Sequence, residues 1–437
     1  MTTMKHINAT AAFLDFTYRI KPVLMKLLPV SLLRRIKKRM VLRFMSKLES
    51  KAPILPFART AYPDGVNLIG FIKGEIGLGE SCRLIAASLQ EAGIDFTIYN
   101  YEQVSAIRSR DASWEHKITD TTPYNINLIH INPYELPLAY SRLDHAIWDN
   151  RYNIAFWLWE LEVFPHSWLS AIHLVDEIWT PSDFAGDSIR KATDKPVRTI
   201  PYGLATLDKG TYGRAHFDLP EDPFLFLCMY DSGSTMERKN PLGAIEAYKR
   251  AFPPDEPGVG LIIKINNPQP HDIQAVHTAL AGYPEVFILS DVLEKTEVHA
   301  LIACADVYVS LHRSEGFGLV PAEAMMLGTP VIATDWSANT EFMHSDIACM
   351  VGYQFVTIEE DCGPYEAGNR WAEPDIGQAA DFMRKLYEDD DYHTRMTADA
   401  QSYIREKLAP ARAAHLIRDR IEEIYAAHHT DDGGMAG

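Results

Sequence analysis

Cysteine is scarce in this sequence, and its cysteines show no pairing pattern. The 437 residues include five cysteines, an odd number, and none lies in a C-x-x-C spacing. Scattered cysteines of this kind are typical of buried thiols in a reducing compartment, and the spacing argues against a structural zinc site or a disulfide framework. We therefore expect a cytoplasmic protein.

Long hydrophobic runs are absent as well. No apolar stretch approaches the roughly 18 residues that a membrane-spanning helix needs. The apolar stretch Pro22–Leu33 contains Lys26, is followed by basic residues and lacks a small-residue cleavage site. It therefore does not have the pattern of a secretory signal peptide.

Outside the first 50 residues, basic side chains are well outnumbered by acidic ones. The whole chain has a formal net charge of -17, whereas residues 1–50 hold eleven Lys and Arg residues against two acidic ones. This segment carries +9, which leaves -26 on the remainder. Because an acidic body repels phosphate backbones, we expect no nucleic-acid partner.

The basic N-terminus has the pattern of an amphipathic helix. Between Ser31 and Leu48, apolar residues recur at helical spacing, and seven Lys or Arg residues occupy the other face. One interpretation is that residues 19–48 bind an anionic membrane surface, which would make the protein peripheral on the inner face of the plasma membrane. The alternative is a helix that packs on its own domain and leaves a solvated basic face.

The rest of the chain alternates short apolar strands with helices. This alternation predicts parallel sheets with helices on both faces, and the length is sufficient for two such domains. We expect a basic amphipathic helical extension at 1–60, one domain at 61–210, a second domain at 211–410, and at 411–437 a helix that packs back on the first domain, followed by a disordered tail. Two sheets that face each other would bind ligands at the carboxyl ends of their strands.

The predicted elements follow from apolar runs and helix-end residues. The predicted strands are Val66–Ile72, Phe96–Tyr99, Asn127–Ile131, Ile154–Trp159, Ile178–Thr180, Val197–Ile200, Phe224–Met229, Gly260–Ile265, Val286–Leu289, Val307–Leu311 and Val331–Ala333. The predicted helices include Glu80–Ala92, Pro241–Ala251, Glu297–Cys304, Asp375–Glu388 and Ala411–His428.

The most informative segment is 311–323, which follows a predicted strand and opens a helix. Gly316 and Gly318 allow a ligand to approach the backbone closely, and the free N–H groups at the helix start attract an anion such as a diphosphate. Glu315 and Glu323 can each accept two hydroxyl donors, a property that suits sugar binding. The pattern therefore predicts a site for a phosphorylated sugar compound.

With Gly316, Phe317, Gly318 and Leu319 between its carboxylates, this segment resembles the Glu-x7-Glu motif of the retaining glycosyltransferases of family 4, of the bacterial surface-polysaccharide type. The resemblance runs from about residue 67 to the late helices. It implies the α/β GT-B fold, in which two Rossmann-like, doubly wound parallel-sheet domains face a cleft. It also implies that Glu315 contacts the donor hexose and that Glu323 holds the ribose hydroxyls, with the residues between them lining the donor site.

A second match is the run Glu-Arg-Lys-Asn-Pro at 237–241, after a predicted strand. The resemblance implies that Arg238 and Lys239 neutralise the donor pyrophosphate, a role that a metal ion has in other enzymes. Arg offers a planar fork and Lys a point charge, so the pair can stabilise a departing nucleoside diphosphate. Surface pairs of this kind are otherwise usually solvated.

The glycine loop at 74–80 follows the first predicted strand. Gly77 and Gly79 in such a loop are a weak phosphate-binding signal, which a dinucleotide fold would share. No acidic residue ends the second strand at the distance that a dinucleotide site requires. The resemblance implies that this loop borders the donor phosphates and the acceptor.

The sequence departs from the family pattern at one place. Many relatives carry a His at the end of the strand that is predicted here at Ile154–Trp159, but this chain has Glu160 instead. A carboxylate there could stabilise an oxocarbenium charge or accept the acceptor's proton. His130, after another strand, is the second candidate, and each of the two could equally be structural.

We therefore expect a metal-independent, cofactor-free hexosyltransferase that uses a nucleotide-diphosphate sugar as donor. GDP-mannose is the donor we favour, with UDP-sugars open, and the acceptor would be a glycan or a polyprenyl-linked oligosaccharide of polysaccharide biosynthesis. Two alternatives remain. A sugar-nucleotide hydrolase or epimerase could use the same contacts, or the chain could be an inactive scaffold at the membrane.

Overall fold

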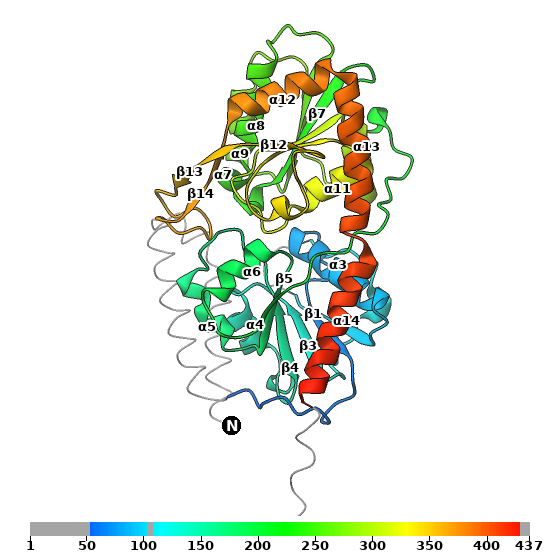
Figure 1. The fold of residues 1–437 in the computed structure, drawn as a ribbon, viewed down its shortest axis with the longest axis vertical. Helices are drawn as coiled ribbons and strands as arrows, with labels where there is room; N and C mark the ends of the chain where they lie inside the picture. Colours follow the sequence, from blue (N-terminus) through cyan, green and yellow to red (C-terminus); the bar gives the residue numbers. More distant parts are fainter. Residues whose placement is uncertain (1–52, 103–107, 429–437) are drawn as a thin grey trace, which may run out of the picture.

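The computed structural model describes residues 53–102 and 108–428 of the chain, and in them two α/β domains lie one above the other (Figure 1). The basic segment 19–48 and the tail after residue 428 lie outside the described residues. No helix in the described part of the chain is long and apolar enough to cross a membrane.

The N-terminal domain is built on a parallel sheet of six strands in the order β2-β1-β3-β4-β5-β6. Its central strands are buried along their whole length, as expected for a sheet that helices cover on both faces. The strands are β1 (Val66–Gly70), β2 (Phe96–Asn100), β3 (Ile126–His130), β4 (Tyr152–Phe156), β5 (Glu177–Thr180) and β6 (Val197–Thr199). The helices are α3 (Gly77–Glu91), α4 (Leu136–Arg142), α5 (Leu169–Ile172) and α6 (Asp183–Arg190).

The C-terminal domain repeats this architecture with the strand order β12-β11-β10-β7-β8-β9, again all parallel. Its strands are β7 (Phe224–Asp231), β8 (Val259–Asn266), β9 (Val286–Leu289), β10 (Val307–Ser310), β11 (Val331–Thr334) and β12 (Cys349–Val351). Its helices are α7 (Met236–Lys239), α8 (Pro241–Ala251), α9 (Pro270–Ala279), α10 (Lys295–Cys304), α11 (Leu319–Leu327), α12 (Ile376–Glu388) and α13 (Asp390–Lys407).

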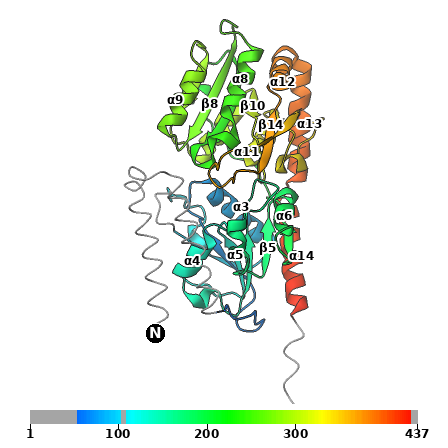
Figure 2. The same ribbon diagram turned by 90° about the vertical axis from the view of Figure 1, so that its left-hand side faces the viewer.

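The last helix, α14 (Pro410–Ala427), returns to the N-terminal domain and packs against α3 (Figures 1 and 2). Arg420 binds the fully buried carboxylate of Glu177 with an N···O distance of 2.6 Å. Arg418 donates to the carbonyl of Ala92 at 2.7 Å. Because this helix is bonded to residues of the first domain, the chain crosses between the domains twice.

An antiparallel hairpin of β13 (Tyr353–Thr357) and β14 (Arg370–Pro374) extends from the C-terminal domain. In Figure 1 it lies at the edge of the upper domain, above α6 of the lower one. Its connecting loop, residues 358–369, reaches the N-terminal domain. There Arg370 binds Glu162 at 2.7 Å and Tyr365 contacts Trp159 with a centroid distance of 5.6 Å.

The two predicted parallel sheets are confirmed, but some elements differ from the sequence-based expectation. The predicted strand Ile154–Trp159 ends at Phe156, because the chain leaves the sheet there and turns into the cleft between the domains. The pattern search missed β12, the hairpin and α13. β12 is only three residues long, and α13 buries just four of its 18 side chains, so neither has a strong apolar pattern.

Candidate functional site

A cleft of about 1250 Å³ separates the two domains, and residues at the carboxyl ends of both sheets line it. We call its two sides the C-terminal wall and the N-terminal wall. The C-terminal wall comprises Arg238, Lys239, Glu315, Gly316, Phe317, Gly318, Leu319 and Glu323. The N-terminal wall comprises Gly77, Tyr134, Trp159, Glu160 and Trp168.

The loop after β10 brings the two predicted carboxylates to the cleft. Glu315 lies in this loop, and Glu323 lies in the first half of α11. Gly318 caps α11 with a φ of +97°, a conformation that a side chain would strain. A Cβ on Gly316 would lie 3.1 Å from the carbonyl oxygen of Trp159, so this glycine lets the loop approach the N-terminal wall closely.

Glu315 is held by the two predicted cations. Its carboxylate accepts from Lys239, and the guanidinium of Arg238 lies 3.2 Å from its other oxygen. Arg238 also donates to the carbonyl of Ser314 at 2.7 Å. Burial alone would raise the pKa of Glu315, but Lys239, Arg238 and His312 lower it to about 2, so the carboxylate is ionised at neutral pH.

Arg238 is buried, with 4% of its surface exposed. Burial alone would lower its pKa, but Tyr365, Glu315 and Glu160 raise it above the ordinary value, so the charge is kept. A buried cation whose acidic neighbours come from both sides of the cleft is positioned to meet an anionic ligand.

Glu323 lies deeper in the cleft, beside two basic groups that sequence analysis missed. One of its oxygens is 3.7 Å from Lys295 and 3.7 Å from His299. Lys295 also pairs with Glu80 of α3. This cluster links the C-terminal wall to the first domain. Because Lys295 and His299 lie about 25 residues before Glu323 in the sequence, no local motif indicated their proximity.

Glu160 reaches the cleft from the loop after β4. The phenol of Tyr365 donates to its carboxylate at 3.3 Å, and the Ser314 hydroxyl donates to its main-chain carbonyl. Mainly because it is buried, Tyr365 has a pKa well above the ordinary value of a phenol. Its hydroxyl therefore stays protonated and can donate a hydrogen bond. Tyr365 had no sequence signal, because it lies in the hairpin loop that the pattern search did not find.

His130, the other candidate, does not line the cleft. Its side chain is fully buried and stacks on Phe156 with a centroid distance of 5.1 Å. Ser81 contacts its Nε2 at 2.6 Å and also bonds with Tyr202. Burial lowers the pKa of His130 to about 4, so the ring is neutral at physiological pH.

The two predicted loop glycines have different surroundings. Gly77 lines the cleft at the start of α3, whereas Gly79 does not. A Cβ on Gly79 would lie 1.9 Å from the carbonyl oxygen of Gly74, so only glycine lets the loop fold onto the helix. Gly79 therefore shapes the loop without facing the cleft.

The other residues of the N-terminal wall are aromatic, and sequence analysis did not single them out. Trp159 packs edge-on against Trp168 with a centroid distance of 4.8 Å, and Trp168 also contacts Tyr134 at 5.9 Å. Tyr134 is 46% exposed. Three tryptophans within residues 157–168 were the available signal.

Two parallel-sheet domains that face a cleft, with the last helix returning to the first domain, define the GT-B class of α/β proteins. Residues 214–403, most of the C-terminal domain, match the family described as glycosyl transferases group 1. The presence of this domain supports glycosyltransferase activity. A search of curated protein sequences gives no match.

Solved structures support the fold assignment. The chain is similar to Alr3699/HepE from Anabaena, solved with UDP and glucose, at a TM-score of 0.58 and 13% identity over 82% of this chain and all of that one. It is also similar to a sucrose-phosphate synthase from Thermosynechococcus elongatus (TM-score 0.59, 15% identity, 83% of this chain and 100% of the other). The N-terminal domain of a Candida albicans trehalose-6-phosphate phosphatase matches at a TM-score of 0.56 and 12% identity, over 85% and 99% of the two chains.

Proposed function

We propose that this protein is a retaining, metal-independent hexosyltransferase that moves a sugar from a nucleoside-diphosphate donor to a glycan or lipid-linked acceptor in polysaccharide biosynthesis. The observation that carries this proposal is the buried cluster of Glu315, Arg238 and Lys239, which faces Glu160 across the cleft. It combines a hydroxyl acceptor with two cations, as a sugar joined to a diphosphate requires.

The donor would lie along the C-terminal wall. Glu315 would accept hexose hydroxyls, and Glu323 would accept the ribose hydroxyls. Arg238, Lys239 and the N–H groups at the start of α11 would neutralise the diphosphate as it leaves. Arg238 and Lys239 bind Glu315 in the structure, so a bound diphosphate would share these cations with the carboxylate.

The acceptor would approach from the N-terminal wall. For retention of configuration, its hydroxyl attacks the anomeric carbon on the face from which the diphosphate leaves. Glu160 lines the cleft and His130 does not. We therefore assign to Glu160 the task of stabilising the positive charge that develops on the sugar or of accepting the acceptor's proton.

The nucleotide can be identified by thermal shift with UDP, GDP, ADP, CMP and dTDP and their sugar conjugates, in the absence of metal. GDP-mannose remains a candidate, and UDP-glucose joins it because Alr3699/HepE has been solved with UDP-glucose. We expect one diphosphate to raise the melting temperature by mass action. Arg238→Lys should reduce this shift, because a point charge cannot reproduce the forked contact of Arg.

The matched control is Arg214→Lys. Arg214 is another largely buried Arg of the same domain, but it binds Asp306 and main-chain carbonyls away from the cleft. This variant should lower the melting temperature while keeping the nucleotide-induced shift. No shift with any nucleotide would contradict the donor site and favour an inactive scaffold. Release of free sugar or an isomer, with no transfer to any acceptor, would favour the hydrolase or epimerase alternative.

Membrane association is a separate proposal, since residues 19–48 lie outside the described residues. We propose that this basic segment binds anionic lipid and so brings the cleft to a lipid-linked acceptor. We expect the full-length protein to sediment with vesicles of phosphatidylglycerol and phosphatidylcholine. Removal of residues 1–50 should abolish this binding. Unchanged binding would contradict the proposal.

A further inference from the structure

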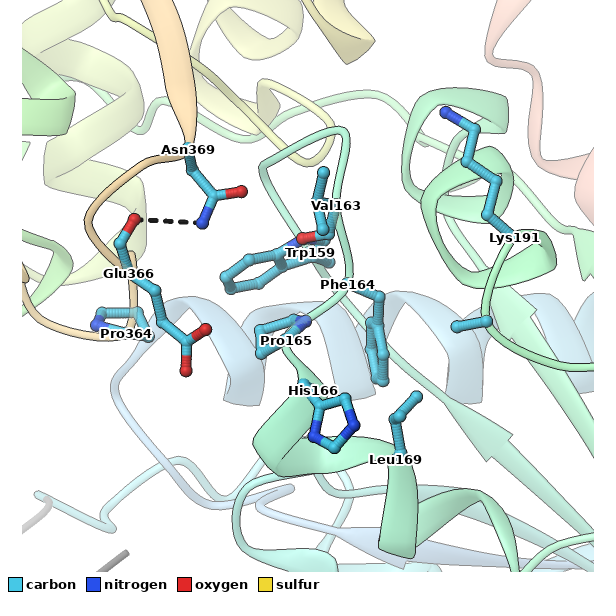
Figure 3. A pocket seen from close by; sticks show the side chains of 11 residues that line it. Trp159, Val163, Phe164, Pro165, His166, Leu169, Lys191, Pro364, Glu366 and Asn369 are labelled. Carbon is cyan, nitrogen blue, oxygen red and sulfur yellow. Dashed lines mark hydrogen bonds between the residues drawn. The ribbon is translucent and has the colours of Figure 1, made fainter. Parts of the chain in front are cut away.

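A second cavity of about 430 Å³ opens beside the cleft, and nothing in the donor site uses it (Figure 3). Its walls come from both domains. The N-terminal domain contributes the segment between β4 and α5, together with Lys191 and Ala192 after α6. The C-terminal domain contributes Pro364, Glu366 and Asn369 from the hairpin loop. We call this cavity the side pocket.

The side pocket has a fixed aromatic floor. The indole N–H of Trp159 donates to the carbonyl of Val163 at 2.9 Å, which sets the orientation of the ring. Phe164 stacks on Trp157 with a centroid distance of 5.9 Å and an interplanar angle of 17°. Figure 3 shows the Trp159 ring, Phe164 and Pro165 between the hairpin loop on one side and Lys191 on the other. The floor therefore presents rigid apolar surfaces.

Polar groups of mixed charge surround this floor. Glu366, Asn369, His166 and Lys191 line the pocket beside the apolar residues. The Asn369 amide donates to the main-chain carbonyl of Glu366 at 3.0 Å, which holds the loop in place (Figure 3). Glu366 and Lys191 carry opposite charges, so the rim has no excess of one sign and favours an uncharged ligand that is rich in hydroxyl groups.

The side pocket adjoins the cleft next to the proposed catalytic carboxylate. Trp159, Pro364 and Glu366 line both cavities, and Trp159 directly precedes Glu160. A ligand in the side pocket would therefore lie beside Trp159, the residue next to Glu160. That is where the part of an acceptor adjoining its reactive hydroxyl must lie.

We infer that the side pocket binds a neutral sugar ring of the acceptor glycan. This inference rests on the proposed function and assigns its acceptor subsite. A pyranose ring has an apolar C–H face that matches the aromatic and proline floor, and its hydroxyl groups can bond to the polar rim. A prenyl chain would match the apolar floor but would offer no hydrogen bonds to the polar rim. The volume lies within the range of small-ligand sites, about 300–1,000 Å³.

Saturation-transfer NMR on the full-length protein tests this assignment directly. The probes are maltose, cellobiose, lactose and mannobiose, with farnesyl phosphate as the lipid probe. We expect at least one disaccharide to receive saturation from the wild type. Ala192→Trp, which fills the pocket, should abolish the signal, and His166→Ala and Glu366→Gln should each weaken binding at least fivefold.

The matched controls are Ala281→Trp, at an exposed alanine of the other domain, and His173→Ala, at an exposed histidine after α5; neither residue lines the pocket. Both should keep the signal. The inference is overturned if no disaccharide binds, or if disaccharide binding survives both Ala192→Trp and His166→Ala. It is also overturned if farnesyl phosphate is the only probe that binds and Ala192→Trp removes that binding. The nucleotide-induced thermal shift should persist in Ala192→Trp, His166→Ala and both controls. If the wild type shows this shift but binds no disaccharide, the side pocket is refuted and the donor site is left standing.

Discussion

The two walls of the cleft differ in the side chains that they present to a ligand. On the C-terminal wall, Arg238, Glu315 and Glu323 are charged side chains that are 4–8% exposed and have oppositely charged neighbours. On the N-terminal wall, Tyr134 is 46% exposed and its ring packs against that of Trp168. Buried charges require fixed partners, whereas aromatic faces accept ligands of varied shape. One wall is therefore preorganised for a defined ionic group, and the other can accept a more variable surface.

The largest expected effect comes from breaking the C-terminal wall. Glu315→Gln should lower turnover on the order of 100-fold or more, because an amide cannot replace a carboxylate that accepts hexose hydroxyls between two cations. The measurement is the initial rate of nucleoside-diphosphate release with saturating donor and acceptor. Circular dichroism and the melting temperature establish whether the variant folds.

Glu373→Gln is the matched control for this prediction. Glu373 also pairs with an Arg of the C-terminal domain, Arg313 at 2.5 Å, but it does not line the cleft. We expect near-normal turnover from this control. Comparable turnover in a folded Glu315→Gln variant would remove Glu315 from the proposed site.

The next largest effect is expected from a substitution in the N-terminal wall. Trp168→Ala should raise the acceptor KM about tenfold and leave the donor KM unchanged, because the ring lies on the N-terminal wall away from the cations. Trp114→Ala, at a partly buried tryptophan of the same domain outside the cleft, should leave both constants unchanged. A rise in the donor KM for Trp168→Ala would show that the two walls do not divide the substrates between them.

The two walls also differ in how well the sequence predicted them. Glu315, Gly316, Gly318 and Glu323 form one local motif on a strand–loop–helix unit, so spacing alone brought these residues together. Arg238 and Lys239 lie in a separate short run, and the family resemblance, not the local pattern, singled them out. For all of these residues, the expectation that they face one cleft follows from the parallel sheet, since strands of such a sheet end at the same edge.

The residues of the N-terminal wall could not be predicted from the sequence in this way. Tyr365 reaches Glu160 from a hairpin about 200 residues away, and no periodicity encodes that contact. His130 and Glu160 both lie near the ends of predicted strands, so the pattern could not separate them. Only packing shows that His130 turns into the core while Glu160 faces the cleft.

A pH experiment tests this separation of His130 from the cleft. Burial lowers the pKa of His130 from 6.5 to about 4, so the folded protein binds fewer protons there than the unfolded chain. Its neutral form contributes stability that is complete above pH 6.5 and is lost as pH falls toward 4. The melting temperature of His130→Gln should therefore decrease less steeply over this window than that of the wild type.

His173→Gln, at an exposed histidine, should follow the wild-type profile in the same experiment. Turnover at pH 7.5 should remain within about threefold of the wild type in His130→Gln, because the ring does not face the cleft. A large loss of turnover with an unchanged melting profile would place His130 at the reacting atoms and contradict the assignment to Glu160.

The smallest effect concerns the contact that joins the two walls. Tyr365 donates to Glu160 at 3.3 Å while its ring lies 5.9 Å from the Arg238 guanidinium, so one side chain touches both sides of the cleft. Tyr365→Phe removes only the hydroxyl. It should lower kcat about fivefold, the value of one modest hydrogen bond. Tyr353→Phe, in the first strand of the same hairpin, should leave kcat unchanged. If Tyr365→Phe alters the donor KM alone, the residue serves the C-terminal wall, and the bond to Glu160 has no part in the reaction.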